Sequence, residues 1–181
     1  MALNYLYKMT STKIKELQPK CNLAFIPLGP TEVHGPHLPL MTDFRSGLEL
    51  CERAARKLQE EGIESIIATP VTYCAADVTN VFPGNTSLRV ETVEMLLEDI
   101  CLSLARSGFY NIMVVSGHAD RVMLRQLSEV LRMRKRKTTR SMVPIRRGLT
   151  KALLKVAQQH ILMVFIQHMT SMQVNQKQDL V

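Results

Sequence analysis

Three short apolar segments, separated by amphipathic ones, constrain the fold of this chain more than any other feature. Residues 22–28 (N-L-A-F-I-P-L), 64–71 (E-S-I-I-A-T-P-V) and 111–116 (N-I-M-V-V-S) have the length and composition of buried strands. Pro70 weakens the end of the second strand because proline has no backbone N–H to donate. We predict an α/β fold, with a mostly parallel sheet and helices on both of its faces.

Amphipathic segments predict helices over residues 10–17, 43–61 and 89–106, and a fourth that begins near residue 123. Thr10 or Ser11 offers a capping side chain for the first helix. Glycines at 62 and 108 would end the next two. The predicted inward positions are Phe44, Leu48, Cys51, Ala55 and Leu58 in the second helix, and Val93, Leu96, Leu97, Ile100 and Leu104 in the third.

A polar loop follows the first predicted strand. Residues 28–43 read L-G-P-T-E-V-H-G-P-H-L-P-L-M-T-D, which places Glu32, His34 and Asp43 in a loop stiffened by three prolines. Carboxylates and imidazoles on a stiff loop at a strand end are what a divalent metal site needs. The alternative is a polar surface loop whose histidines are incidental.

A second polar cluster follows the strand at residues 111–116, where His118 and Asp120 lie two residues apart. A histidine at such a turn is more often a capping or packing residue than a ligand. In open α/β sheets, however, ligands bind outside the carboxyl ends of strands. If the two strands are neighbours, we expect His118 and Asp120 to join the first cluster.

Three segments resemble motifs of the creatininase (creatinine amidohydrolase) family. Residues 32–43 (E-V-H-G-P-H-L-P-L-M-T-D) resemble the motif E-Q-H-G-P-H-L-P-L-x-T-D. Residues 81–88 (V-F-P-G-N-T-S-L) resemble F-P-G-T-x-S-L, and residues 116–118 resemble N-G-H, with Ser116 in place of Asn. The motifs occur in the family's order, and the resemblance covers about residues 10–130 of this chain.

The resemblance implies a centre of two divalent metal ions per subunit, for which Zn²⁺, Mn²⁺ and Fe²⁺ are all suitable. Glu32, Asp43 and His118 would hold one metal ion. His34, Asp43 and Asp120 would hold the other, with Asp43 bridging. Asp120 stands where creatininase has a glutamate, so the carboxylate is kept with a shorter reach.

The resemblance also implies hydrolysis of a C–N bond in a small cyclic amide, by a metal-activated water as in creatinine amidohydrolase. The leaving nitrogen would need a proton from a general acid. The family's later segment that supplies this acid, G-E-H-A-G-x-x-E-T-S, has no clear counterpart here, and H-M-T-S from residue 168 is only a faint echo. The catalytic acid and the substrate-binding residues therefore stay unassigned.

The chain also departs from the family before the F-P-G motif. Family members often have Gly, Ser and His there, whereas this chain has Cys74, Ala76 and Thr79, so creatinine is not assumed as the substrate. The loop at residues 81–88 fits a surface turn as well as a substrate-facing loop. His37 matches a family position, and we expect it to support a ligand rather than bind metal.

Charge divides the chain into two unequal parts. Residues 1–120 carry a formal charge of −4 and residues 121–181 carry +11, which together give +7. We expect a creatininase-like α/β domain over residues 1–131 and a divergent basic segment over residues 132–181. The basic run at residues 132–140 could bind nucleic acid or anionic membranes. On composition, a solvated and partly disordered tail is expected instead. No recognition motif accompanies the basic run, which argues against a nucleic-acid binder.

A chain that diverges in this way could be a shortened member of the family, through truncation, alternative splicing or a shifted reading frame. The alternative function is then a catalytically impaired remnant that binds metal and acts through assembly or its basic tail. The resemblance implies a homo-oligomer, often a hexamer. Four cysteines without paired spacing, no signal peptide and no bilayer-length apolar run predict a cytoplasmic protein with reduced thiols and no membrane attachment.

Overall fold

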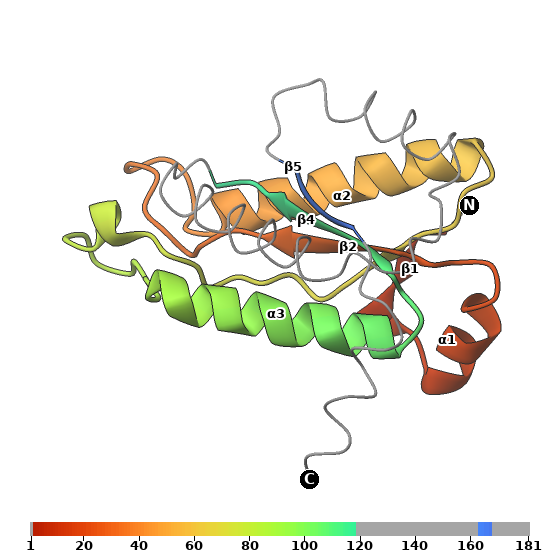
Figure 1. Ribbon diagram of the computed structural model, residues 1–181. Coiled ribbons are helices and arrows are strands. Elements are labelled where there is room, and N and C mark those ends of the chain that lie inside the picture. The colour runs from red at the N-terminus through yellow and green to blue at the C-terminus, as the bar shows by residue number, and fades with distance from the viewer. Residues whose placement is uncertain (1, 119–162, 168–181) are drawn as a thin grey trace, which may run out of the picture.

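The computed structural model describes residues 2–118 and 163–167, and a five-stranded sheet lies at its centre (Figure 1). The strand order is β1-β3-β2-β4-β5. Strands β1 to β4 are parallel, and β5 runs antiparallel along β4. Their bounds are β1 Asn4–Tyr5, β2 Leu23–Leu28, β3 Ile66–Ile67, β4 Asn111–Ser116 and β5 Met163–Gln167. The predicted mostly parallel α/β sheet is confirmed.

Helices cover both faces of this sheet, as predicted (Figure 1). Helix α2 (Thr42–Glu60) packs on one face, and α1 (Ser11–Leu17) and α3 (Val90–Arg106) pack on the other. Two short 3-10 turns, η1 (Leu6–Lys8) and η2 (Asp77–Thr79), complete the elements described.

The central strand β2 is apolar throughout because both of its faces are covered. All six of its residues are buried. Leu23 and Phe25 point toward α2, while Ala24, Ile26 and Leu28 point toward α3. This alternation explains why the sequence shows one continuous apolar run here instead of an apolar and polar alternation.

The first three predicted helices are confirmed, with two exceptions among the inward positions: Phe44 is half-buried and belongs to neither apolar cluster, and Leu96 is exposed. The Thr10 side chain accepts a hydrogen bond from the Lys13 N–H at 3.3 Å and so caps α1. Glycines with φ of 75° and 89°, at positions 62 and 108, follow α2 and α3. The prediction for Leu96 is wrong, because this side chain is 39% exposed. The helical stripe that contains Val93 and Leu97 continues instead through Cys101.

Strands β1 and β5 were not predicted from the sequence, and strand β3 is shorter than predicted. Strand β3 has two residues, and the chain rejoins the ladder only through a single bridge between Leu28 and Val71. Pro70 lies just before that bridge, and the strand ends at Ile67, earlier than predicted. Strand β1 is too short to leave a pattern in the sequence. The predicted helix near residue 123 and the boundary at residue 131 lie outside the described residues.

Two further expectations concern the cysteines and membranes. All four cysteines are free and buried, in agreement with the prediction of reduced thiols. Within the part of the chain that the structure describes, no helix has both the length and the apolar character that crossing a bilayer requires.

Candidate metal centre

Helix α2 begins directly against the carboxyl ends of β2 and β4, because three glycines allow backbones to touch there. A Cβ atom at Gly117 would lie 2.1 Å from the Asp43 carbonyl oxygen, and one at Gly29 would lie 2.6 Å from the Phe44 nitrogen. A Cβ atom at Gly47 would lie 2.9 Å from the carbonyl oxygen of Leu28, the last residue of β2. No side chain fits in these gaps. The glycines therefore place Asp43, in the first turn of α2, at the rim of the sheet.

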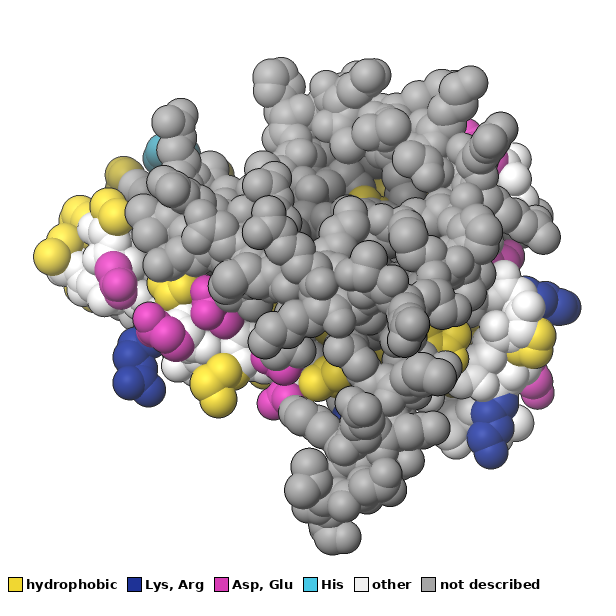
Figure 2. Space-filling view, in the orientation of Figure 1, with side chains coloured by type: hydrophobic (Ala, Val, Ile, Leu, Met, Phe, Trp, Pro, Cys, Tyr) yellow, Lys and Arg dark blue, Asp and Glu magenta, His cyan; other side chains and the backbone are white. Residues whose placement is uncertain are grey.

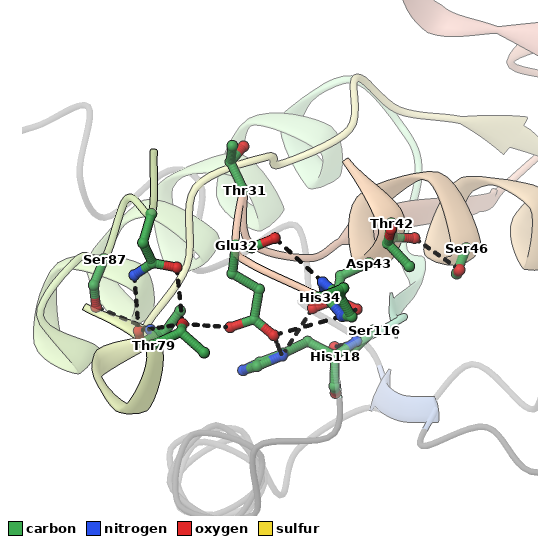
Figure 3. Close-up of polar contacts among 12 residues, drawn as sticks. Thr31, Glu32, His34, Thr42, Asp43, Ser46, Thr79, Ser87, Ser116 and His118 are labelled. Carbon is green, nitrogen blue, oxygen red and sulfur yellow. Dashed lines mark hydrogen bonds and ion pairs between the residues drawn. The ribbon is translucent and has the colours of Figure 1, made fainter. Parts of the chain in front are cut away.

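Four of the five predicted ligands meet at this rim (Figure 3). Single ligand atoms of Glu32, Asp43 and His118 all lie within 4.8 Å of one another. The His118 Nδ1 atom lies 3.0 Å from Asp43 Oδ2 and 3.3 Å from Glu32 Oε1. The His34 Nε2 atom lies 3.0 Å from Asp43 Oδ1. Asp120, the fifth, lies outside the described residues.

The two carboxylates of this cluster are buried side by side. Glu32 is 8% exposed and Asp43 is 5% exposed. Burial raises the pKa of the Glu32 carboxyl above its ordinary range, and the neighbouring Asp43 raises it further, against the lowering effect of His118 and His34. Within residues 2–118, the ion pairs of both carboxylates are with these two histidines. Two carboxylates buried side by side are costly unless positive charge, such as that of a metal ion, lies between them. The donor set therefore fits a divalent metal ion.

A backbone carbonyl orients the His34 ring, and the Ser116 side chain fixes the backbone of His118. His34 Nδ1 lies 3.2 Å from the Glu32 carbonyl oxygen, and an N–H donated there leaves Nε2 facing Asp43 with its lone pair. The Ser116 hydroxyl accepts from the His118 N–H at 3.1 Å and donates to the His118 carbonyl oxygen at 3.0 Å. A metal-binding histidine usually donates its second ring N–H to a carboxylate, a backbone carbonyl or water, and the Nδ1 atom of His34 is placed to do so.

The loop after β3 also reaches the cluster, through two residues that the sequence did not assign to the site. The Thr79 Oγ1 atom lies 3.3 Å from Glu32 Oε2 and 2.8 Å from Asn85 Oδ1. The sequence singled out Thr79 only as a departure from a family motif, and it gave no sign of this contact. The tip of the same loop is exposed, because Val78 and Val81 are each 83% accessible. Figure 2 shows hydrophobic side chains at the surface of the left end of the molecule, where this loop lies in Figure 1. The loop is therefore both a surface turn and a part of the rim.

Two other features lie apart from this cluster. The His37 ring is exposed and lies beside Gly35, where a Cβ atom would be 3.5 Å from it. A cavity of about 650 Å³ lies between α1 and α3, with Leu6, Ile14 and Ile100 among its lining residues. None of the cluster residues lines this cavity, so it is not part of the candidate metal centre.

Carboxylates and imidazoles at the carboxyl ends of two adjacent parallel strands define the class: an α/β protein with a candidate metal site at the rim of its sheet. The sequence profile described as "Creatininase: Creatinine amidohydrolase" matches residues 7–179. The chain belongs to the creatininase family. This match extends past residue 131, where we predicted a boundary, and the boundary itself stays a prediction.

The relatives are named for several different enzymatic activities. The chain is 32% identical over 114 residues to a mycofactocin precursor peptide peptidase from Mycolicibacterium smegmatis, covering 62% of this chain and 45% of the relative. It is 28% identical over 98 residues to a creatinine amidohydrolase from Pseudomonas putida, covering 54% of this chain and 38% of the relative. The chain therefore spans less than half the length of these relatives.

Solved structures show the same fold. A crystal structure from Bacteroides fragilis, described as that of a candidate creatinine amidohydrolase, has a TM-score of 0.59 and 30% identity, and covers 70% of this chain and 51% of that one. A structure described as "Creatininase Mn" has a TM-score of 0.61 and 21% identity, with 75% and 54% covered.

Proposed function

We propose that this chain is a metal-dependent hydrolase that acts on an amide-type C–N bond. One observation carries the proposal: the two oxygens of Asp43 face different histidines, Oδ2 toward His118 and Oδ1 toward His34, each at 3.0 Å. A carboxylate that bridges two metal ions presents one oxygen to each of them. A carboxylate with a purely structural role has no need of this arrangement.

In this proposal, Glu32, Asp43 and His118 hold one metal ion. His34 and Asp43 hold the second together with Asp120. The family's solved structures include forms described as Mn and as Zn-Zn, which supports metal use without fixing which ion this chain takes. Two such ions would polarise a carbonyl group and lower the pKa of water toward neutrality.

The chain's own residues would shape access to the centre. The His118 side chain is 10% exposed and the His34 side chain is 24% exposed, so the more open side of the cluster lies at His34. We propose that the substrate approaches from this side. The burial of Glu32 and Asp43 would keep bulk water away from their carboxylates, and electrostatic interactions at the centre would therefore be strong. The general acid stays unassigned.

The relatives do not agree on the bond that is hydrolysed: two are named for a peptide and for creatinine, which contain amide-type C–N bonds, whereas a Thermotoga maritima protein is named for 3-dehydro-scyllo-inosose, which contains no nitrogen. A small cyclic amide remains our first proposal, and short peptides form the second panel of substrates. We also propose that the chain assembles into a homo-oligomer, which light scattering on the purified protein would test. Its proposed location is the cytoplasm.

The experiment is a substrate screen on the full chain, loaded with Zn²⁺ or Mn²⁺ and compared with chelator-treated protein. The matched variants are Glu32→Ala, which removes a proposed ligand, and Glu91→Ala, which removes an exposed carboxylate in the first turn of α3. Turnover that is lost in Glu32→Ala and after chelation, but kept in Glu91→Ala, is the expected result. Metal binding without turnover of either cyclic amides or short peptides would contradict the proposal that the chain is a hydrolase. It would favour instead a metal-binding protein that acts through assembly or its basic segment.

A further inference from the structure

The outer oxygen of Glu32 has a specific partner on a neighbouring loop. Glu32 Oε1 faces the two histidines, while Oε2 points away from them toward Thr79, whose hydroxyl oxygen lies 3.3 Å away (Figure 3). Thr79 ends the short turn η2, which follows β3 along the chain. The two oxygens of one carboxylate are thus divided between two separate parts of the fold.

The loop holds the Thr79 hydroxyl in place through Asn85. The Asn85 side-chain nitrogen donates to the Ala76 carbonyl oxygen at 3.1 Å and to Asn80 Oδ1 at 3.0 Å. These two acceptors use both N–H groups of the amide and fix which way it faces. Its oxygen therefore lies toward Thr79, at 2.8 Å from Oγ1. The position of the hydroxyl is set by the loop and does not depend on Glu32.

Proton counting shows what this hydroxyl can do. Thr79 has one hydroxyl proton, and three oxygens surround it: Glu32 Oε2, Asn85 Oδ1 and the Ala76 carbonyl oxygen at 3.1 Å. The Ala76 oxygen already accepts from the Asn85 amide and from the Thr79 backbone N–H at 3.4 Å, which occupies both of its lone pairs. The single hydroxyl proton is therefore divided between Asn85 Oδ1 at 2.8 Å and Glu32 Oε2 at 3.3 Å. An ionised Glu32 is the stronger acceptor, because hydrogen bonds to charged groups are about twice as strong as neutral ones.

We propose that Thr79 is a positioning residue for the metal centre: its hydroxyl holds Glu32 Oε2 at the loop, so that Oε1 alone is presented to the metal ion beside His118. This inference rests on the proposed function and deepens it. It assigns to the loop a role in fixing how Glu32 binds metal. Without the hydroxyl, the carboxylate can rotate and offer both oxygens or neither.

The test compares three threonine variants of the full chain. Thr79→Val removes the hydroxyl at nearly constant volume, and Thr79→Ser keeps it. Thr31→Val is the matched control, because the Thr31 hydroxyl, in the residue before Glu32, donates to the Thr72 carbonyl oxygen at 3.0 Å and not to a carboxylate. For each variant, we would measure Zn²⁺ affinity by competition with a chelator. The visible absorption spectrum of the Co²⁺-loaded protein would report ligand geometry.

We expect Thr79→Val to weaken metal affinity by about 10- to 100-fold, the range seen when a hydrogen-bond partner of a ligand is removed. It should also change the Co²⁺ spectrum, while Thr79→Ser and Thr31→Val resemble the wild type in both. Wild-type affinity and spectrum in Thr79→Val, or an equal loss in Thr31→Val, would overturn the inference and leave the proposed function standing. A wild-type chain that binds no metal would overturn both.

Discussion

The two faces of the sheet are built on different principles. On the α2 face, Gly29, Gly47 and Gly117 let the first turn of the helix touch the strand ends directly. On the α3 face, helix and sheet are separated by large buried side chains such as Leu97, Ile112 and Phe109. The first face brings a carboxylate to the rim, while the second provides the larger part of the apolar core.

The α2 face therefore sets the position of a candidate metal ligand, whereas the α3 face contributes mainly to the stability of the fold. Changes at the glycine contacts should disturb the candidate metal centre, because they move Asp43. Changes on the α3 face should alter the free energy of unfolding without altering metal affinity. The four predictions below test this separation, from the largest expected effect to the smallest.

The largest effect is expected at Asp43. We expect Asp43→Ala to weaken metal binding by about 1,000-fold or more, equivalent to about 4 kcal/mol, because both proposed metal ions lose a ligand. The metal-free protein should change in stability by less than about 1 kcal/mol, since a lost helix N-terminal charge is offset by relief of the repulsion with Glu32. Calorimetric titration and urea unfolding measure the two quantities.

The control for Asp43 is Glu49→Ala, in the same helix. Glu49 is partly exposed and pairs with Arg53 and Arg45. Metal affinity should be unchanged in this variant. A metal-free Asp43→Ala protein that fails to fold would show that Asp43 is structural, against our interpretation.

The next effect is expected at Gly117. A Cβ atom there would overlap the Asp43 carbonyl oxygen, so Gly117→Ala must move α2 away from the strand end. We expect a loss of about 3 kcal/mol in stability, together with weaker metal binding. Gly62→Ala is the control: its φ is +75° and nothing lies within 4 Å of the added atom. It should cost about 1 kcal/mol from backbone strain alone and leave metal affinity intact. Equal metal affinities in the two variants would contradict the role of the close contact.

A smaller effect is expected on the opposite face. Ile112 in β4 is buried on the side of the sheet that faces α3. The substitution Ile112→Val removes one methyl group and should lower the free energy of unfolding by about 1 kcal/mol. Metal affinity should equal that of the wild type, because the strand ends do not move. A drop in affinity as large as that of Gly117→Ala would mean that the two faces are not independent.

The smallest effect concerns pH at Tyr5, which contacts the middle of α2 through Glu52 and is not part of the metal cluster. Burial raises the pKa of Tyr5 to about 12, assisted by the hydrogen bond that its hydroxyl donates to Glu52 at 2.7 Å. An unfolded chain would lose this proton near pH 10. The stability that Tyr5 contributes is therefore complete below about pH 10 and is lost as pH rises toward about 12.

The unfolding free energies of the wild type and of Tyr5→Phe should accordingly converge over this pH range. Tyr7→Phe leaves the Tyr5 hydroxyl in place and should keep the pH dependence of the wild type. A constant difference between the wild type and Tyr5→Phe would show that Tyr5 keeps its ordinary pKa.

The sequence predicted the parts of this fold that carry a long, regular pattern. The runs 22–28 and 111–116 are uniformly apolar because both faces of those strands are covered, and both were assigned correctly. Helix α3 was placed to within one residue of its start because its apolar side chains recur at helical spacing. The ligand candidates were proposed because carboxylates and imidazoles after a strand suit a divalent metal ion and because their motifs resemble those of the creatininase family. The structure brings four of the five together.

Features that depend on tertiary contact were not predictable in this way. Strand β1 has two residues, and only its pairing with β3 defines it. Thr79 and Asn85 are ordinary loop residues in sequence, and they join the site only because the loop folds back onto Glu32. The close approach at Gly117 likewise leaves no local signal, since any glycine after a strand looks the same.

The central claim is that the rim of this sheet holds metal ions, and elemental analysis tests it most directly. The full chain would be purified without chelator beside a variant that combines Glu32→Ala with His118→Ala. We predict about two metal ions per chain in the wild type, as a dinuclear centre requires, and their loss in the variant. Absence of metal from both proteins would contradict the claim and would leave the cluster as a structural relic of the family.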